Sequence, residues 1–242
     1  MENIFDSWLV NTYIAHRGLH DEECPENSLP AFQKAIDKGY AIELDVRLLA
    51  DNNVVVFHDE QISRMTSGDK YINNLTKDTI LDYNLKDSKE KIPLFSQVLE
   101  LVDGKVPLLI EIKNEGNPGE LEKQVLKMLK EYKGEYAIQS FNPYVVEWFK
   151  DNAPEITRGI LSSYFKGEKL ACYKKFALKR MLLNKKCEPM FISYDVRNLP
   201  NRYVRKYENL PILTWVVRSQ QDYERVIKFS DNIIFENFTP KI

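Results

Sequence analysis

The sequence predicts a (β/α)8 TIM barrel, an α/β fold in which eight parallel strands alternate with helices, with a small insertion after the second strand. Short apolar runs alternate along the chain with segments whose apolar residues recur at helical spacing, which is typical of a parallel sheet. The length of 242 residues is close to the roughly 250 residues that such a barrel commonly uses as one domain. No G-x-G-x-x-G follows a strand, so a doubly wound open sheet is the less favoured alternative. We therefore expect a single domain over residues 1–242.

The first β-α-β unit lies at the start of the chain. The first expected strand covers residues 12–16 and ends in a turn. In the polar loop that follows, Asn27 or Ser28 can cap a helix in whose first turn Pro30 is tolerated. The next apolar run, residues 41–47, is the second expected strand, and it completes the unit.

The second strand carries two carboxylates within an apolar run. Side chains alternate between the faces of a strand, so Glu43 and Asp45 share one face while Leu44 lies on the other. At about 4 Å and an effective dielectric of about 20, two like charges repel by roughly 4 kcal/mol. The pair therefore needs water, a cationic side chain or a metal ion beside it. A further apolar run, residues 54–58, is expected as an extra strand that places His58 at its carboxyl end.

Segment 59–91 is polar and irregular, with little apolar periodicity. It is too long for an ordinary connection between elements, so we interpret it as an insertion. Beyond it, strands and helices alternate to the end of the chain. The expected strands are residues 106–113, 136–140, 157–161, 190–195, 212–217 and 232–235, and the expected helices are residues 94–102, 118–132, 143–152, 165–183, 200–207 and a last one opened by Ser219.

Composition and charge exclude several classes of function. The chain has 34 Lys and Arg against 36 Asp and Glu, a net charge of −2, which indicates no nucleic-acid footprint. No apolar run approaches the roughly 18 residues of a membrane span, and no secretory signal is visible. Cys24, Cys172 and Cys187 are odd in number and widely spaced, which argues against disulfides and a thiolate metal site. We therefore expect a soluble, cytoplasmic protein without a stable membrane anchor.

Ionisable residues gather where the expected strands end. The active site of a TIM barrel lies at the carboxyl ends of its strands, and the residues expected there are His16, Glu43, Asp45, His58, Glu111, Lys113 and Trp215. Three carboxylates without a cysteine indicate a hard cation, Mg²⁺ or Ca²⁺, whereas a zinc site would use more histidines. Two histidines beside a cation, with Arg17 and Lys113, suit a phosphate substrate. One histidine would act as base and the other as acid.

Simpler interpretations of the same residues stay open at this point. A lone histidine is often structural, and we expect this of His20, which lies in a loop. Glu111 and Lys113 can form a plain ion pair at a strand end, and the basic residues at 174–180 are expected to lie on a solvated helix face. The convergence of all the groups on strand ends favours a site over these separate explanations.

Five short motifs, in order and at similar spacing, resemble those of the glycerophosphodiester phosphodiesterases. The resemblance covers nearly the whole chain, and segment 59–91 resembles the insertion of that family. Each motif alone is weakly specific, but five in register are strong. The motifs are His16-Arg17-Gly18, Pro25-Glu26-Asn27-Ser28, Glu43-Leu44-Asp45-Val46, His58-Asp59 and Glu111-Ile112-Lys113.

The resemblance implies a TIM-barrel enzyme of lipid and glycerol metabolism that hydrolyses a small-molecule glycerophosphodiester to glycerol 3-phosphate and an alcohol. By position it implies His16 and His58 as the acid/base pair. The implied ligands of the divalent cation, Mg²⁺ or Ca²⁺, are Glu43, Asp45 and Glu111. The residues implied to contact the substrate or shape its site are Arg17, Lys113, Trp215, Glu26 and Asn27. Attack on phosphorus by water and attack by the glycerol hydroxyl through a cyclic phosphate both fit this set.

The chain departs from the family pattern at two places. The usual Trp-Thr-Val-Asn is Trp215-Val216-Val217-Arg218 here, and the usual Thr-Asp is Phe235-Glu236. The catalytic set is intact, but the identity of the leaving alcohol is left open. Two alternatives remain: a phospholipase C-like or D-like enzyme acting on lipid phosphodiesters, and a non-catalytic phosphate-binding barrel. The sequence also leaves open whether the chain forms a homo-oligomer.

Overall fold

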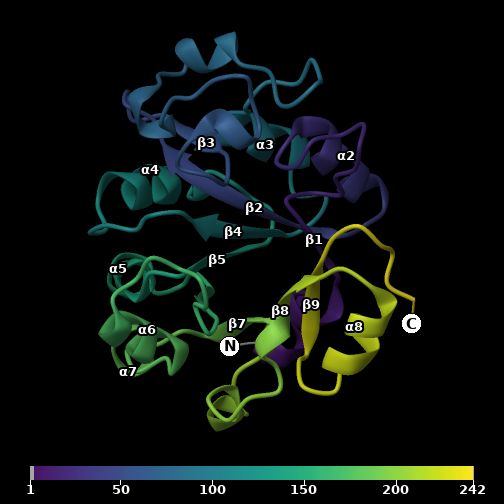
Figure 1. Cartoon of the computed structure of the whole chain (residues 1–242), viewed down its shortest axis with the longest axis vertical. Coiled ribbons are helices and arrows are strands. Elements are labelled where there is room, and N and C mark those ends of the chain that lie inside the picture. Colours follow the sequence, from purple (N-terminus) through teal and green to yellow (C-terminus); the bar gives the residue numbers. More distant parts are fainter. Residues whose placement is uncertain (1–2, 242) are drawn as a thin grey trace. The chain divides into compact units, whose positions relative to one another are not determined.

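The computed structural model of the protein describes residues 3–241. The described chain forms two compact units, one spanning residues 15–136 and the other joining residues 3–14 to residues 137–241. Each unit contains parallel strands separated by helices (Figure 1). Together the described strands comprise the eight parallel strands of a TIM barrel and one additional antiparallel strand, so the predicted fold class is confirmed. The single domain over residues 1–242 stays a prediction.

The unit of residues 15–136 contains the first strands and the insertion. Its second strand pairs in parallel with the strand that follows the insertion, and Asp45 lies opposite Glu111 in this register. Its elements are β1 (Ile14–His16), α2 (Leu29–Asp37), β2 (Ala41–Leu48), β3 (Val54–Val56), α3 (Phe95–Val102), β4 (Leu108–Ile112) and α4 (Glu120–Leu129).

Strand β2 is longer than expected, and β3 is shorter. The last residues of β2, Val46 to Leu48, pair antiparallel with β3, so Glu43 and Asp45 lie inside β2 and not at its end. They still lie at the carboxyl end of the parallel pairing with β4, which stops at Ile112. The prediction that His58 ends a strand is wrong by two residues, since β3 ends at Val56. The His58 carbonyl accepts a hydrogen bond from the Arg47 side chain (Nε–O 2.8 Å).

The insertion between β3 and α3 is built from short 3-10 turns, η2 (Ile62–Arg64), η3 (Ile72–Asn74) and η4 (Thr79–Asp82). The expectation of an irregular segment is therefore confirmed. Its polar composition hides a hydrophobic cluster, in which one buried apolar residue from each turn packs with residues at and around β3. The buried residues of this insertion cluster are Leu49, Val55, Phe57, Ile62, Met65, Ile72, Leu75, Ile80, Leu85 and Ile92.

The other unit contains a run of five parallel strands, β5 to β9, in which each strand pairs with the next. Buried aromatic residues, among them Phe149, Phe191 and Tyr194, fill the space beneath its helices. Its elements are η1 (Ile4–Asp6), α1 (Trp8–Asn11), β5 (Tyr136–Ser140), α5 (Pro143–Asn152), β6 (Arg158–Ser162), α6 (Cys172–Lys179), α7 (Asn184–Cys187), β7 (Phe191–Asp195), η5 (Val196–Asn198), η6 (Val204–Tyr207), β8 (Ile212–Val217), α8 (Gln220–Val226) and β9 (Asn232–Phe235).

Two helix predictions in this unit are wrong. The expected helix at 165–183 contains only the shorter helix α6, and Phe165 (φ 51°) before it and Met181 (φ 54°) after it have left-handed backbones. The expected helix at 200–207 is replaced by the single short turn η6. There the side chain of Asn201 accepts from the backbone N–H groups of Tyr203 (2.8 Å) and Val204 (3.0 Å), and such local bonds compete with helix formation.

Helix starts agree with the sequence. Ser28 caps α2, accepting from the N–H of Ala31 at 3.3 Å, and Ser219 caps α8, accepting from the N–H of Asp222 at 3.1 Å. These bonds satisfy backbone donors that have no partner within the helix. Over residues 3–241, no helix has the length and apolar character needed to cross a membrane.

Candidate active site

Three buried carboxylates form the centre of the candidate site, in the unit of residues 15–136. Glu43 and Asp45 come from β2 and Glu111 from β4, and their side chains are almost fully buried. Because Asp45 and Glu111 are direct partners in the parallel register, their side chains emerge on the same face. One oxygen from each of the three carboxylates lies within 4.8 Å of the others. The predicted convergence of these three residues is therefore present.

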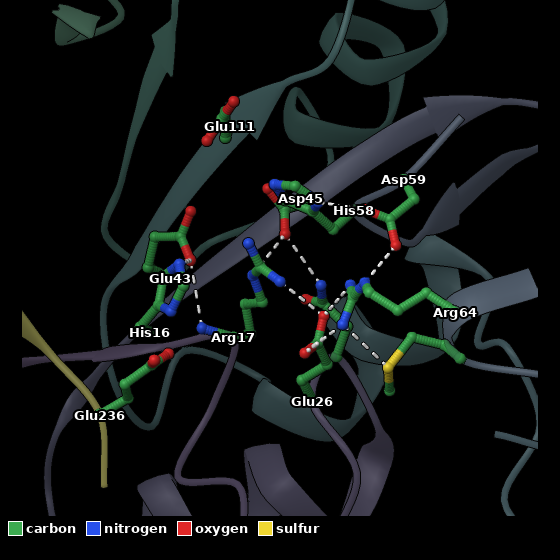
Figure 2. A network of polar contacts seen from close by, with 12 residues as sticks. His16, Arg17, Glu26, Glu43, Asp45, His58, Asp59, Arg64, Glu111 and Glu236 are labelled. Atoms are coloured by element: carbon green, nitrogen blue, oxygen red, sulfur yellow. Dashed lines mark hydrogen bonds and ion pairs between the residues drawn. The ribbon is translucent and has the colours of Figure 1, made fainter. Parts of the chain in front are cut away.

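Two cationic side chains lie against this cluster. The Lys113 ammonium is 2.6 Å from Glu111 Oε1 and 3.2 Å from Asp45 Oδ1. Arg17 Nε lies 3.3 Å from Asp45 Oδ2 (Figure 2). The charges are fixed by the fold, since Lys113 directly follows β4 and Arg17 directly follows β1. Opposite charges at these distances in a buried region compensate the cost of removing the carboxylates from water.

Burial and charge act differently on the carboxylates. Burial, followed by the neighbouring charges of Asp45 and Glu111, raises the pKa of Glu43 well above its usual value. Burial opposes ionisation of Asp45 too, but Lys113, His58 and Arg17 outweigh it and hold the pKa of Asp45 well below the usual value. The pKa of Lys113 is raised despite burial, because Asp45 and Glu111 surround it. The cluster thus has three carboxyl groups beside two cations, and its surroundings favour the neutral form of Glu43.

The turn after β1 brings a histidine and an arginine to this cluster. His16 Nε2 lies 4.0 Å from Glu43 Oε2, and the backbone N–H of Arg17 donates to the same oxygen at 3.1 Å. Arg17 has a left-handed backbone (φ 57°), and so has Gly18 (φ 79°). A Cβ on residue 18 would lie 2.9 Å from the backbone carbon of Ala31 and the ring of Phe32, so only glycine fits.

The loop before α2 contacts the same carboxylate from another side. Asn27 donates from Nδ2 to Asp45 Oδ2 at 2.9 Å, and its backbone N–H donates to the Arg17 carbonyl at 3.0 Å. Glu26 Oε1 accepts from Arg17 Nη1 at 2.6 Å. Asn27 therefore contacts the central carboxylates directly, whereas Glu26 holds Arg17.

His58 is paired with the residue that follows it. Its Nδ1 lies 2.7 Å from Asp59 Oδ1. Asp59 stays ionised, since hydrogen bonds from His58 and Arg64 outweigh burial and lower its pKa. The carboxylate accepts, so Nδ1 of His58 donates and Nε2 is left for other partners. His58 is about one-third exposed (32%), which gives its ring access to solvent.

The residues fit a divalent cation. Carboxylate oxygens are the ligands that Mg²⁺ and Ca²⁺ prefer, and three of them converge here. Asp45 Oδ1 is buried and accepts no hydrogen bond from the described part of the chain, although the Lys113 ammonium lies near it. A bound cation would supply this oxygen with a partner and lower the pKa of Glu43. The geometry does not select one ion over the other.

Trp215 lies on β8, in the unit of residues 3–14 and 137–241. Its ring packs edge-on against Phe141, with centroids 5.4 Å apart, and its indole Nε1 is buried without a hydrogen-bond partner among residues 3–241. Arg218 and Glu236, which follow β8 and β9, form an ion pair with Nε and Oε1 2.6 Å apart. The role of Trp215 at the substrate stays a prediction.

Sequence reasoning missed two side chains that contact the predicted residues. Arg64, from the insertion, donates to both Glu26 and Asp59, and Arg47 donates to the His58 carbonyl. Asp59 belongs to the motif His58-Asp59, in which the sequence assigns no separate role to the carboxylate. An acidic residue directly after a predicted catalytic histidine was a usable signal, because such a histidine commonly needs a carboxylate to orient its ring. No pattern in the sequence pointed to Arg64.

Comparisons with known proteins agree with this geometry. The model of the glycerophosphoryl diester phosphodiesterase family matches residues 16–239. A glycerophosphodiester phosphodiesterase of Caldanaerobacter subterraneus subsp. tengcongensis is 32% identical over 239 residues, which are 93% of this chain and 93% of the relative.

Solved structures show the same fold. A phosphodiesterase of Oleispira antarctica, solved in complex with the product sn-glycerol-3-phosphate, superposes with a TM-score of 0.80 at 22% identity, over 94% of this chain and 93% of that one. A glycerophosphodiester phosphodiesterase of Parabacteroides distasonis superposes with a TM-score of 0.75 at 26% identity, over 93% and 92%.

Proposed function

Since the chain belongs to the glycerophosphoryl diester phosphodiesterase family and is therefore a phosphoric diester hydrolase, we propose that it hydrolyses a small glycerophosphodiester with the help of a divalent cation. The products are glycerol 3-phosphate and an alcohol. The observation that carries the proposal is the convergence of Glu43, Asp45 and Glu111, buried and in register, beside Arg17 and Lys113. This set offers oxygen ligands to a cation and positive charge to a phosphate.

Glu43, Asp45 and Glu111 are the proposed ligands of Mg²⁺ or Ca²⁺. When bound, the cation polarises the phosphoryl oxygens and stabilises the charge that develops on them. Arg17 and Lys113 add positive charge and orient the diester. Asn27 holds Asp45 through its amide, and Glu26 holds Arg17. We retain Trp215 as a proposed apolar contact for the glycerol or the alcohol.

His16 and His58 are the proposed acid and base. One removes the proton from the oxygen that attacks phosphorus, and the other gives a proton to the alcohol oxygen as its bond to phosphorus breaks. Such an acid and base each contribute about 10²–10⁴ in rate. Asp59 orients the His58 ring, so that Nε2 is the nitrogen available for this transfer.

The test is release of glycerol 3-phosphate from glycerophosphocholine, glycerophosphoethanolamine and glycerophosphoglycerol. Each is assayed after EDTA treatment and again after Mg²⁺ or Ca²⁺ is restored. We expect no release with EDTA, recovery with the cation, and at least a 10²-fold loss for His16→Ala and for His58→Ala. Lys105→Ala, at an exposed position outside the proposed site, is the control and is expected to keep wild-type activity. Release that EDTA does not affect would overturn the dependence on metal.

Two further outcomes separate the alternatives. Release from a lysophospholipid but from none of the three small diesters would favour the phospholipase D-like alternative. Binding of glycerol 3-phosphate without turnover of any diester would favour the non-catalytic barrel. A cytoplasmic location is also proposed, supported by the three cysteines, all of which are free thiols. Cell fractionation tests it.

A further inference from the structure

The guanidinium of Arg64 bridges two carboxylates that come from different loops. Its Nε donates to Asp59 Oδ2 at 2.5 Å. Its two terminal nitrogens donate to Glu26, Nη2 to Oε1 at 2.7 Å and Nη1 to Oε2 at 3.0 Å. The second contact is the two-pronged arrangement that gives an arginine a fixed orientation on a carboxylate. Figure 2 shows Arg64 between Asp59 and Glu26.

Each of these carboxylates also holds a residue of the proposed site. Asp59 Oδ1 lies 2.7 Å from His58 Nδ1, and Glu26 Oε1 accepts from Arg17 Nη1 at 2.6 Å. A continuous chain of charged contacts therefore runs from His58 through Asp59, Arg64 and Glu26 to Arg17. Arg17 at its end contacts Asp45, but Arg64 itself contacts none of the three central carboxylates, and the proposed function gives Arg64 no role.

Without Arg64, the Asp59 carboxylate would have few contacts to fix its position. The only other side chain that contacts its carboxylate in the described part of the chain is His58, the group that it would orient. Arg64 in turn is braced by Glu26, whose pKa is lowered to about 2 because hydrogen bonds from Arg64 and charge from Arg17 outweigh burial. Glu26 is thus a permanently charged anchor at neutral pH.

The backbone of Arg64 is fixed although its side chain is 45% exposed. It ends the turn η2, and the flanking residues Ile62 and Met65 are buried in the insertion cluster. Arg64 Nη1 also lies 3.1 Å from Met65 Sδ. The insertion therefore presents the guanidinium from a packed support and not from a loose loop.

We infer that Arg64 is a positioning residue: braced on Glu26, it fixes the Asp59 carboxylate and through it the orientation of the His58 ring. The inference rests on the proposed function for the role of His58. By this inference, the insertion contributes to the reaction by positioning His58. A displacement of about 1 Å in a reacting group can cost about 10²-fold in rate, so we expect kcat to report the loss of Arg64 while KM changes little.

The first experiment measures kcat and KM for Arg64→Ala, Arg64→Lys, Asp59→Asn and the double variant Asp59→Asn with Arg64→Ala. We expect Arg64→Ala to lower kcat about 10- to 100-fold. Arg64→Lys should recover only part of it, because an ammonium cannot fork onto Glu26 and reach Asp59 together. In the Asp59→Asn background, removing Arg64 should cost much less than it does in the wild type, because both changes disable one unit.

The matched control is Arg225→Ala. Arg225 pairs with Asp222 at 2.8 Å on α8 and is 43% exposed, close to the exposure of Arg64. Its hydrogen bonds go to the carbonyls of Val196 and Leu199 and to Asp222, none of which belongs to the proposed site. Its removal should leave kcat unchanged, which shows that loss of an exposed arginine pair is not by itself sufficient to lower turnover.

The second experiment observes His58 directly and does not depend on activity. The chain has three histidines, so imidazole ¹H–¹⁵N spectra can be assigned by single substitutions. We expect a hydrogen-bonded Nδ1 proton of His58 in the wild type, its loss or broadening in Arg64→Ala and Asp59→Asn, and its retention in Arg225→Ala. The signals of His20 should stay where they are.

Two outcomes would decide against the inference, and a third would decide against the proposed function. Unchanged kcat and an unchanged His58 signal in Arg64→Ala would make Arg64 a surface ion pair only. A rise in KM that persists undiminished in the Asp59→Asn background would place Arg64 on the substrate. Absence of turnover in the wild type would instead overturn the proposed function, and the His58 spectra would still show whether Arg64 fixes the ring.

Discussion

Arg218 and Glu236 are joined by an ion pair, with Nε and Oε1 2.6 Å apart, directly after neighbouring strands β8 and β9. They are two of the four residues at which the chain departs from the family motifs, the other two being Val216 and Phe235. A neutral amide and an aspartate have been replaced by a cation and a longer carboxylate. Since these two replacements contact each other, we interpret them as one linked change.

We predict that this pair adds little to stability. Arg218 is 56% exposed and Glu236 10% exposed, and pairs open to solvent contribute about 0.2–1 kcal/mol. A double-mutant cycle of Arg218→Asn and Glu236→Gln in urea should give a coupling in this range. Coupling above about 2 kcal/mol would show that the pair is screened far less than its exposure indicates.

Lys113 is predicted to be essential to stability in the absence of metal. It is 9% exposed and contacts two buried carboxylates, and removing one partner of a buried ion pair costs about 3–5 kcal/mol. Lys113→Met should lower the free energy of unfolding by that amount in EDTA, and Mg²⁺ or Ca²⁺ should recover part of it. The exposed Lys105→Met is the control. A loss as small as that of the control would contradict the prediction.

We predict that the contribution of Glu26 to the free energy of unfolding is lost in acid. Its pKa falls from 4.5 to about 2 on folding, and a group with a lowered pKa stabilises the fold above its unfolded value. The difference in unfolding free energy between wild type and Glu26→Gln should be constant above about pH 5 and shrink between pH 4.5 and 2. Urea titrations at several pH values measure it. A difference that stays constant down to pH 2 would show that Glu26 titrates normally.

Gly159 is predicted to tolerate no side chain. It lies on β6 opposite Phe191 of β7, and a Cβ there would overlap the Phe191 ring, which is fully buried. Gly159→Ala should cost about 1–3 kcal/mol through overpacking. Gly116→Ala is the control, since a Cβ there would meet its nearest atom, Asn114 Oδ1, at 3.4 Å, which is an ordinary contact. Equal unfolding midpoints for the two variants would mean that the ring moves aside freely.

A single domain predicts one unfolding transition for both units. All three tryptophans, Trp8, Trp148 and Trp215, belong to the unit of residues 3–14 and 137–241. Tryptophan fluorescence therefore reports that unit, whereas far-ultraviolet circular dichroism reports both. The two urea curves should coincide, which is the standard test of two-state unfolding. Separate midpoints would show that the units unfold independently.

Strands were predicted better than helices. The ranges 136–140, 212–217 and 232–235 agree with β5, β8 and β9, because short apolar runs with β-branched residues allow few other structures. The helix expected at 165–183 is much shorter in the structure, because left-handed residues, Phe165 and Met181, lie on either side of α6. Backbone reversals at a residue other than glycine leave no compositional signal.

The site was predicted to the extent that it depends on strand register. Glu43, Asp45 and Glu111 follow from alternation and from the pairing of β2 with β4. Arg64 could not be predicted in the same way, since it meets Glu26 across 38 residues of sequence. That contact depends on how the insertion cluster packs, and the pattern of segment 59–91 does not reveal the packing.

The insertion cluster has a consequence for protein engineering. An insertion that packs around a hydrophobic cluster is a natural candidate for grafting between related proteins. Segment 59–91 of this chain carries Arg64, whose partner Glu26 stays behind in the donor. A graft chosen only for matching ends would therefore leave the guanidinium facing whatever side chain the recipient has at that position. Segment 59–91 and the loop before α2 should therefore be transplanted together.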